Sequence, residues 1–383
     1  VPAEFGDPRI VVHEVAPAAE ANPKVLDGHL EKAVAGTLVR LAREEGVDTF
    51  LTYYADPHAT IAERARRTLR RWGRDVVVVA SVEGSDLTDS LQRHVRDQEA
   101  AVLLADVLAA DVLLVVSDYV RLELAALVTE VFGPEAADLT SARAVVRHPG
   151  LPPSWFVPAP ADEQAAFRAR HGIAADATVV SSYVRLVPEK GVAMLLDVAE
   201  RLAAQRPGTV LVIGGDGRLE QELHAEVRAR GLDGVRLLGH LDQHDAAVLR
   251  STSALGLFPS RPTPAWTETF GISPLEYEAL GVPVVVTDIG GTRESTAHER
   301  FRLPLTADAD TWTGAATALL DDVPTWSGVA REFAGTFTAA RSAGIILDAV
   351  AGALDVREAL GATASIGVLQ PSTTTSLPSG SAS

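Results

Sequence analysis

Short apolar runs alternate with segments of helical periodicity along most of the chain, and this pattern leaves few folds open to it. The runs lie at residues 10–15, 49–54, 76–81, 112–117, 178–183, 209–213, 235–238, 254–259 and 283–287. They are almost wholly apolar, as strands are when helices cover both faces of their sheet. Strands that alternate with helices in this way form parallel α/β units. We therefore expect an α/β fold built on parallel sheets.

A proline-rich stretch divides the chain. Five prolines fall between Pro149 and Pro160, which marks a connection rather than a helix or strand. With 383 residues the chain is long enough for two domains. We expect a first domain over residues 1–155, a second over 156–350 and a helical segment over 351–364. Residues 365–383 are rich in Ser, Thr, Pro and Gly and are expected to form a disordered tail.

The composition argues against several kinds of function. A net charge of −17 disfavours DNA or RNA as a partner, because nucleic-acid-binding proteins neutralise phosphates with a basic surface. The chain has no cysteine, which rules out disulfides and thiolate metal sites and fits a cytoplasmic protein. The nearest candidate for a membrane span, residues 102–116, is interrupted by Asp106 and Asp111. The histidines show no ligand spacing, so no metal is predicted.

The segment from Glu268 to Glu276 concentrates the features of a ligand site. Two carboxylates, which accept hydrogen bonds from hydroxyl groups, flank Phe270, Gly271 and the start of a helix. Glycine lets the backbone approach a ligand closely, and the unpaired N–H groups of a helix start favour phosphate. A sugar nucleotide offers both hydroxyls and phosphate. The structural alternative is that Ser273 to Glu276 form a capping box, in which Glu276 only fixes the helix start.

Further polar turns follow the other strands of the second domain. Arg185 and Lys190 follow its first strand, at the carboxyl end where open α/β sheets bind ligands, and two cations there would hold a diphosphate. The alternative for this pair is a solvated strand end with surface charges. Gly215 and Gly217 follow the next strand, and His240 follows the third. Each glycine turn alone is a weak signal, but together these turns would meet at one crevice.

The order of these segments, from about residue 179 to residue 294, resembles the retaining glycosyltransferases of family 4. These enzymes have the GT-B fold of two facing Rossmann-like domains. The features that match are Arg185, Lys190, the glycine turn at 214–217, Gly239, Pro259 and Ser260, the pair Glu268 and Glu276, and the double glycine at 290–291. The resemblance implies that the second domain binds a nucleotide-diphosphate sugar. One departure is Val184, where the family usually has glycine.

The same resemblance implies roles for individual residues. Catalysis would depend on Arg185, Lys190 and Glu268, with the two cations stabilising the departing diphosphate. The donor would be bound by Gly215, Gly217, His240, Leu241, Phe270, Gly271, Ile272 and Glu276. In this group the backbone near His240 and Leu241 would meet the base, the amides of residues 270–272 would meet the sugar and phosphate, and Glu276 would hold the ribose.

The first domain matches the family less closely. Residues 78–86 resemble the family's strand followed by His-Gly-Ser-Asp, with Glu83 in place of the histidine and Asp86 as the aspartate. In the family that histidine lies beside the donor sugar. We assign Glu83 and Asp86 to the acceptor side, where a carboxylate would accept a sugar hydroxyl or bind an aminated acceptor. The alternative is that Glu83 is an ordinary polar loop residue.

The start of the chain also departs from the family, whose members open with a strand, a glycine-rich loop, a helix and a second strand. Here residues 10–15 resemble the third strand of that pattern, preceded by a polar segment. We therefore expect the first domain to lack its N-terminal strand-helix-strand.

The leading hypothesis is a retaining glycosyltransferase of the hexosyl or N-acetylhexosaminyl class. It would move a sugar from a UDP- or GDP-linked donor, without a cofactor, to a hydroxyl of a glycan or a small hydrophilic acceptor such as an aminocyclitol. The rival is a truncated, inactive sugar-nucleotide-binding remnant. A nicotinamide-dependent dehydrogenase is disfavoured, because neither half has G-x-G-x-x-G followed by an acidic ribose partner. The arginine-rich stretch at 64–74 is interpreted as a solvated helix face, and no membrane contact is expected.

Overall fold

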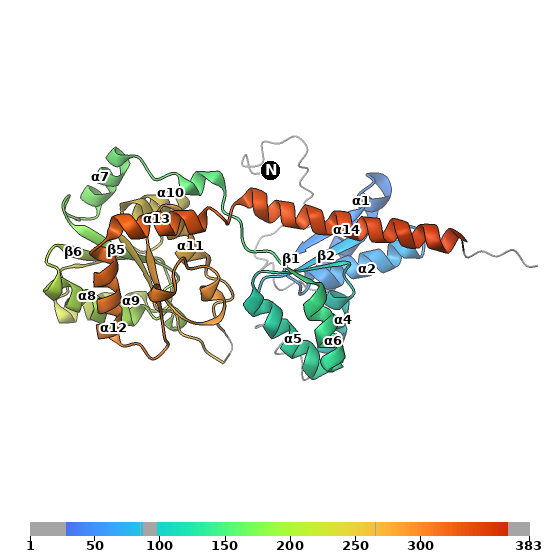
Figure 1. Cartoon of the computed structure of the whole chain (residues 1–383), viewed down its shortest axis with the longest axis horizontal. Coiled ribbons are helices and arrows are strands. Elements are labelled where there is room, and N and C mark those ends of the chain that lie inside the picture. The colour runs from blue at the N-terminus through green and yellow to red at the C-terminus, as the bar shows by residue number, and fades with distance from the viewer. Residues whose placement is uncertain (1–27, 85, 87–97, 265, 367–383) are drawn as a thin grey trace, which may run out of the picture.

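The computed structural model describes residues 28–84, 86, 98–264 and 266–366. In Figure 1 the chain forms two α/β halves that lie side by side, and the last helix, α14 (Ala339–Ile366), runs from the second half back across the first. No helix in these residues combines the length and the apolar character that a membrane crossing would need.

Within the described residues the first half is built on a four-stranded parallel sheet in the order β1-β2-β3-β4. Its strands are β1 (Thr49–Tyr53), β2 (Val77–Val82), β3 (Val112–Val115) and β4 (Ala144–Val146). Its helices are α1 (Gly28–Glu44), α2 (His58–Arg70), α4 (Gln98–Leu108), α5 (Asp118–Phe132) and α6 (Pro134–Arg143).

Successive side chains of β2 and β3 point to opposite faces of the sheet, so each strand packs against two different layers. Val78, Ala80 and Leu113 pack into the core formed with the helices that connect the strands. Val77 and Val79, with Val112 and Leu114, point to the opposite face and pack against Ile346, Ala349, Val350 and Ala353 of α14. Burial of each such side chain stabilises the fold by about 1.5–3 kcal/mol, so α14 serves as the cover of the second face.

The second half is built on a six-stranded parallel sheet in the order β10-β9-β8-β5-β6-β7. Its strands are β5 (Thr178–Tyr183), β6 (Thr209–Gly214), β7 (Val235–Leu237), β8 (Leu255–Phe258), β9 (Val284–Thr287) and β10 (Arg302–Leu303). Its helices are α7 (Ala161–Arg170), α8 (Val192–Gln205), α9 (Glu220–Arg230), α10 (Gln243–Thr252), α11 (Ile272–Ala279), α12 (Ala309–Leu320) and α13 (Val323–Ala334). Short 3₁₀ turns are η2 (Pro153–Phe156), η3 (Pro188–Lys190), η4 (Gly290–Arg293) and η5 (Glu299–Phe301).

The strand order of the second sheet locates a crevice. The chain leaves β5 toward β6 on one side and returns to place β8 on the other side of β5. At such a switch point the loops after the two central strands diverge and leave room for a ligand beyond their carboxyl ends. The loops that carry Lys190 and Glu268 follow β5 and β8, the two strands that flank this point.

The predicted parallel strands are present, with ends that differ by one or two residues, apart from residues 10–15, which lie outside the described residues. The sequence did not indicate β4 or β10, which are only three and two residues long. The linker contains η2, and the expected boundary between residues 155 and 156 falls within it. The expected boundary at residue 350 falls inside α14. The expected tail 365–383 lies outside the described residues except for 365 and 366, the last two residues of that helix.

The arginine-rich stretch is mostly the solvated face that the sequence suggested, since Arg64, Arg67, Arg70 and Arg71 are exposed, but Arg66 departs from it. Arg66 is 2% exposed and lies 2.7 Å from Asp111, and it also pairs with Glu63, which is 3% exposed. Arg67 pairs with the buried Asp106. Since acidic partners occupy these guanidinium groups, part of the stretch forms an ion-pair network inside the first half.

Candidate active site

Lys190 and Glu268, which lie 78 residues apart in the sequence, meet at the switch point of the second sheet. Lys190 Nζ donates to Glu268 Oε1 at 2.5 Å, and Ser260 Oγ donates to the same oxygen at 2.9 Å. The Lys190 ammonium also lies 4.6 Å from the centre of the Trp266 ring, a distance at which a cation and an aromatic face attract. The structure therefore brings together two of the three residues that we expected to be catalytic.

Arg185, the third of these residues, lies on the loop after β5 and is exposed. Within the described residues its guanidinium forms no ion pair and no side-chain hydrogen bond. It is an exposed cation on the loop after β5, and a ligand anion can approach it without displacing a partner among the described residues.

The loop that carries Glu268 is seated on the double glycine of η4. A Cβ on Gly290 would lie 2.0 Å from the Glu268 carbonyl oxygen, and one on Gly291 would lie 2.1 Å from the Thr269 carbonyl oxygen. The Gly291 N–H donates to the Glu268 carbonyl at 2.9 Å. Only glycine permits this close approach of two backbone segments, so the double glycine fixes the position of Glu268.

The start of α11 differs from the capping box that we considered. The helix begins at Ile272, its N-cap residue is Gly271 with φ 94°, and no side chain caps the first turn. The capping-box alternative for Glu276 is therefore wrong, because Gly271, in a left-handed conformation, starts the helix before Ser273. In the part of the chain that the structure describes, no side chain accepts from the first N–H groups of α11, which is the arrangement that attracts phosphate.

Glu276 has a partner that the sequence did not reveal. Its carboxylate lies 2.9 Å from Arg250 on α10, and the two side chains are only 13% and 7% exposed. Burial raises the pKa of Glu276, and the charge of Arg250 opposes that shift. Arg250 thus holds the carboxylate that we expected to bind a ribose.

The glycine turn after β6 packs on the loop after β5. Gly215 has φ 124°, and a Cβ there would lie 1.8 Å from the Val184 carbonyl oxygen, while Gly217 packs in the same way on Leu186. Gly215 thus contacts the backbone of Val184, the position where the family usually has glycine, rather than its side chain.

The residues expected near a nucleotide base lie beside this turn. His240 is exposed, with Nδ1 3.6 Å from an Asp216 carboxylate oxygen. Leu241 is buried, and its carbonyl accepts a hydrogen bond from the Tyr183 hydroxyl at 2.8 Å. Both residues stand at the carboxyl end of β7, next to the Gly215 turn, whose N–H donates to the Gly239 carbonyl at 2.7 Å.

Glu83 and Asp86 occupy different environments in the first half. Glu83 pairs with Arg147 and accepts a hydrogen bond from Ser81 Oγ at 2.5 Å, and its side chain is 8% exposed. Asp86 is buried and accepts backbone hydrogen bonds from Ala55 at 2.6 Å and Gly84 at 2.7 Å. Burial raises the pKa of Asp86 to about 6 despite these donors. Asp86 therefore holds together the loops after β1 and β2.

A cavity of about 260 Å³ lies between the two halves. Its lining includes six of the predicted site residues: Glu83, Lys190, Glu268, Phe270, Gly271 and Ile272. Tyr53 and Tyr54 line it from the first half, and burial followed by the nearby Glu83 charge raises the pKa of both phenols. Arg185, Asp86, Glu276 and the residues after β6 and β7 do not line this cavity.

Thr269 joins the halves at this cavity. Its carbonyl accepts a hydrogen bond from Ser117 Oγ at 2.6 Å, and its hydroxyl donates to the Glu83 carbonyl at 3.2 Å. Gly84, with φ 104°, leaves room for the Thr269 side chain, because a Cβ on Gly84 would lie 2.2 Å from it. The loop of Glu268 is thus held from both halves.

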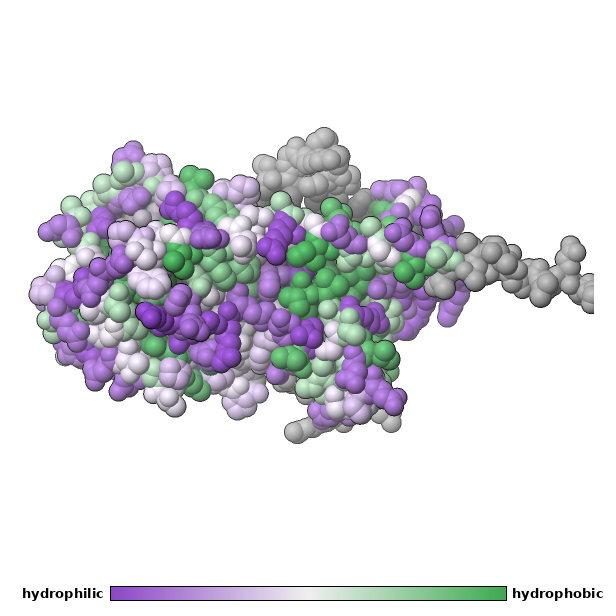
Figure 2. Space-filling view, in the orientation of Figure 1, coloured by the Kyte–Doolittle hydropathy of each residue, from purple (hydrophilic) through white to green (hydrophobic). Residues whose placement is uncertain are grey.

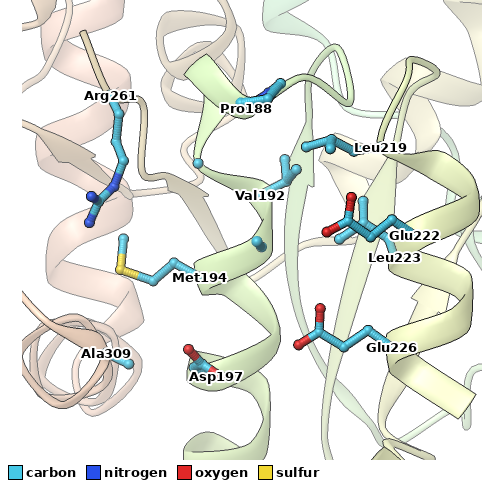
Figure 3. Close-up of a pocket in the computed structure, with 12 residues that line it drawn as sticks. Pro188, Val192, Met194, Asp197, Leu219, Glu222, Leu223, Glu226, Arg261 and Ala309 are labelled. Atoms are coloured by element: carbon cyan, nitrogen blue, oxygen red, sulfur yellow. The ribbon is translucent and has the colours of Figure 1, made fainter. Parts of the chain in front are cut away.

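A larger cavity of about 640 Å³ opens between α8 and α9 (Figure 3). Apolar side chains such as Met194 and Leu223 form much of its wall, and Asp197 and Glu226, which also line it, both pair with Arg230. None of the predicted site residues lines it. We regard the smaller cavity as the site, because it gathers six of the predicted site residues, among them Lys190, Glu268 and the start of α11.

The chain is similar in sequence and in fold to known proteins. Residues 163–323 match the family model described as glycosyl transferases group 1. The GDP-mannose-dependent alpha-(1-6)-phosphatidylinositol monomannoside mannosyltransferase of Mycolicibacterium smegmatis is 31% identical over 306 residues, covering 76% of this chain and 72% of the relative. The D-inositol 3-phosphate glycosyltransferase of Jonesia denitrificans is 32% identical over 185 residues, 45% of this chain and 42% of the relative. The chain spans less than half the length of several such relatives.

Among solved structures, Anabaena HepE in complex with UDP-glucose superposes with a TM-score of 0.63 at 20% identity, covering 86% of this chain and 84% of that one. This likeness confirms the expected fold of two parallel α/β sheets. The chain belongs to the glycosyl transferases group 1 family of GT-B glycosyltransferases.

Proposed function

We propose that this protein is a retaining glycosyltransferase of family 4 that transfers a sugar from a nucleotide-diphosphate sugar to an acceptor hydroxyl. The observation that carries the proposal is the convergence of Lys190, Glu268 and the uncapped start of α11 at the switch point of the second sheet. Cations and a free helix start suit a diphosphate, and carboxylates suit sugar hydroxyls.

In this scheme the diphosphate binds between Arg185, Lys190 and the N-terminus of α11. Lys190 then exchanges part of its contact with Glu268 for the phosphate, and a free oxygen of Glu268 accepts hydroxyls of the sugar. The bond from the anomeric carbon to the phosphate oxygen breaks as the acceptor oxygen bonds to that carbon on the same face. The departing phosphate takes the proton of the acceptor hydroxyl. Stabilisation of its charge by Arg185, Lys190 and the helix start lowers the barrier, and no metal or other cofactor is required.

The chemistry of the site and the names of two similar proteins support a choice of nucleotide and acceptor. We propose UDP or GDP as the nucleotide, since HepE was solved with UDP-glucose and the Mycolicibacterium relative is GDP-mannose-dependent by name. We propose a small hydrophilic acceptor such as an aminocyclitol, and two relatives are named for inositol-containing acceptors. A cytoplasmic location fits these small polar substrates.

The first test is calorimetry with UDP, GDP and ADP, in the intact protein and in two variants. Arg185→Ala removes an exposed cation that has no partner within the described residues, so the fold is expected to persist while nucleotide affinity falls about tenfold or more. Arg228→Ala removes an exposed cation on α9 as the matched control and should leave affinity unchanged. A folded protein that binds none of the three nucleotides would refute the donor site, and binding without turnover would identify an inactive sugar-nucleotide-binding remnant.

A further inference from the structure

Two carboxylates, one from each half, line the cavity between the halves and are held in the same way. Glu83 Oε1 accepts hydrogen bonds from Ser81 Oγ at 2.5 Å and from Arg147. Glu268 Oε1 accepts from Ser260 Oγ at 2.9 Å and from Lys190 at 2.5 Å. Each carboxylate therefore commits one oxygen to a cation and a hydroxyl. In the described part of the chain, Oε2 of Glu83 and Oε2 of Glu268 make no hydrogen bond.

Arg147, the partner of Glu83, is a buried cation. It follows β4, is 8% exposed, and its Nε has no hydrogen-bond partner within the described residues. Its terminal nitrogen Nη2 reaches Ser81 Oγ at 3.2 Å and Glu83 Oε1. Burial of a guanidinium with so few acceptors is costly unless a carboxylate neutralises it. A buried ion pair of this kind contributes little net stability to the fold. We therefore consider how Arg147 affects the Glu83 carboxylate.

The effect on Glu83 is geometric and electrostatic. Arg147 and Ser81 bind the same oxygen, so the carboxylate cannot turn without losing both contacts. The cationic charge of Arg147 also attracts the carboxylate and opposes its displacement. Glu83 is thus kept as an acceptor whose second oxygen remains available in a cavity that Tyr53 and Tyr54 also line.

We propose that Glu83 Oε2 accepts a hydrogen bond from a hydroxyl or ammonium group of the ring bound in this cavity, and that Arg147 is the positioning residue that makes this possible. This inference rests on the proposed function. Because Arg147 and Lys190 already neutralise the two carboxylates and the free oxygens only accept, the bound group must donate. A phosphate or carboxylate directly beside Glu83 Oε2 is disfavoured, since it would face an acceptor, and Arg147 already pairs with Glu83.

The hydroxyl can belong to the transferred sugar or to the acceptor, and two titrations separate these sources. The first compares UDP with UDP-glucose, and GDP with GDP-mannose. The second titrates myo-inositol into the protein saturated with the nucleotide that it binds. Each is made with the intact protein, Glu83→Gln, Arg147→Met and Arg147→Lys. Glu83→Gln is close to isosteric and therefore keeps the test valid if Arg147→Met folds poorly.

We expect Glu83→Gln and Arg147→Met to weaken binding of the sugar nucleotide, or of myo-inositol, about tenfold or more while affinity for the bare diphosphate stays within about twofold. Arg147→Lys should recover part of the loss, because an ammonium can still bind Glu83 Oε1. The ligand whose binding changes identifies the source of the hydroxyl. Arg66→Met is the matched control, since it breaks another buried arginine–carboxylate pair of the first half at a residue that does not line the cavity.

Two other results would overturn the inference in different ways. If the variants leave both titrations unchanged, or weaken the bare diphosphate equally, Glu83 does not contact the ring although the donor site stands. If the intact folded protein binds no nucleotide, the proposed function itself fails, and the inference fails with it.

Discussion

Glu276 and Glu278 lie two positions apart on α11 and have very different surroundings. Glu276 faces Arg250 at 2.9 Å. Glu278 is 2% exposed, accepts the Ala297 N–H at 2.9 Å through Oε1, and its Oε2 has no hydrogen-bond partner within the described residues. Burial raises the pKa of Glu278 well above its ordinary value. Glu276 is thus held beside a cation, whereas burial favours the neutral acid at Glu278.

The environment of Glu278 predicts a pH-dependent gain in stability for Glu278→Gln. A carboxyl with a raised folded-state pKa contributes stability that is fully present below its pKa in the unfolded chain. That contribution is lost as the pH rises through the folded-state pKa. Glutamine keeps the acceptor for Ala297 but does not ionise. The advantage of the variant should therefore grow above about pH 4.5, by at most about 1.4 kcal/mol per pH unit.

Urea unfolding at pH 5, 6.5 and 8 measures this difference. Glu299→Gln, at an exposed position on η5, provides the control and should show no such trend. Unfolding free energies of Glu278→Gln and the intact protein that run parallel across this range would show that Glu278 is ionised in the fold.

The close backbone packing at Gly291 predicts that a side chain at this position would be excluded by steric clash. A Cβ at this position would lie 2.1 Å from the Thr269 carbonyl oxygen, so Gly291→Ala must displace the loop that carries Glu268. We expect a loss of about 1–3 kcal/mol in unfolding free energy, measured by denaturant unfolding, together with weaker nucleotide binding. Gly314→Ala, in the exposed interior of α12 with no atom within 4 Å of the new Cβ, should instead stabilise by about 0.5–1 kcal/mol. Equal effects of the two substitutions would contradict the argument.

At the scale of elements, the N-terminus of α5 in the first half is capped from the second half. Glu294, which follows η4, accepts the N–H groups of Asp118 at 2.7 Å and Tyr119 at 3.0 Å and also contacts His148 Nε2 at 2.9 Å. A carboxylate at a helix start binds free donors and the positive end of the helix dipole. Since η4 also supports the Glu268 loop, this contact joins the site to the packing of the halves.

We predict that removal of the Glu294 charge weakens the contact between the start of α5 and the second half. Glu294→Gln should weaken the cap by about 1 kcal/mol, which corresponds to exchange of the Asp118 and Tyr119 amide protons several-fold faster. Hydrogen exchange resolved to these amides is the measurement. Glu299→Gln, which lies beyond the contact, should leave their rates unchanged. Protection that stays intact in Glu294→Gln would mean that other groups hold α5 in place.

The elements also show where sequence reasoning succeeds and where it cannot reach. Long apolar strands such as β5 and β6, and the loop from Glu268 to Gly271, are visible because hydrophobic runs and glycines are local signals. The capping-box alternative at the start of α11 is wrong because Gly271, not Ser273, is the N-cap residue. The partners of the site residues were missed because Arg147 and Glu83 are 64 residues apart, and Asp118 and Glu294 are 176 apart. No local periodicity encodes such pairs, and a lone arginine resembles any surface charge.

At the scale of the whole molecule, the two halves share their cores. Phe270 and Leu275 from the second half belong to the hydrophobic cluster of the first. α14 follows the second half in the sequence and yet covers the first sheet, where Arg357 lies 2.8 Å from Asp111 and 3.4 Å from Asp75. Figure 2 shows hydrophobic side chains gathered on the visible side of the first half around α14, and Leu347 and Val356 of that helix are exposed. A division of the chain at residue 350 would cut through this cover.

We therefore predict that deletion of α14 destabilises the first half, although the second half is nearer to this helix in the sequence. Truncation after residue 338 would uncover Val77, Val79, Val112 and Leu114, at a cost of about 2 kcal/mol for each side chain that becomes fully exposed. Limited proteolysis should then cleave the first half before the second. Truncation after residue 366 keeps the helix and is the control. Val350→Asp, which places a charge against the same face without shortening the chain, should reproduce the effect. If both halves resist protease equally after the longer truncation, α14 is dispensable, and the first sheet must be stable with one face bare.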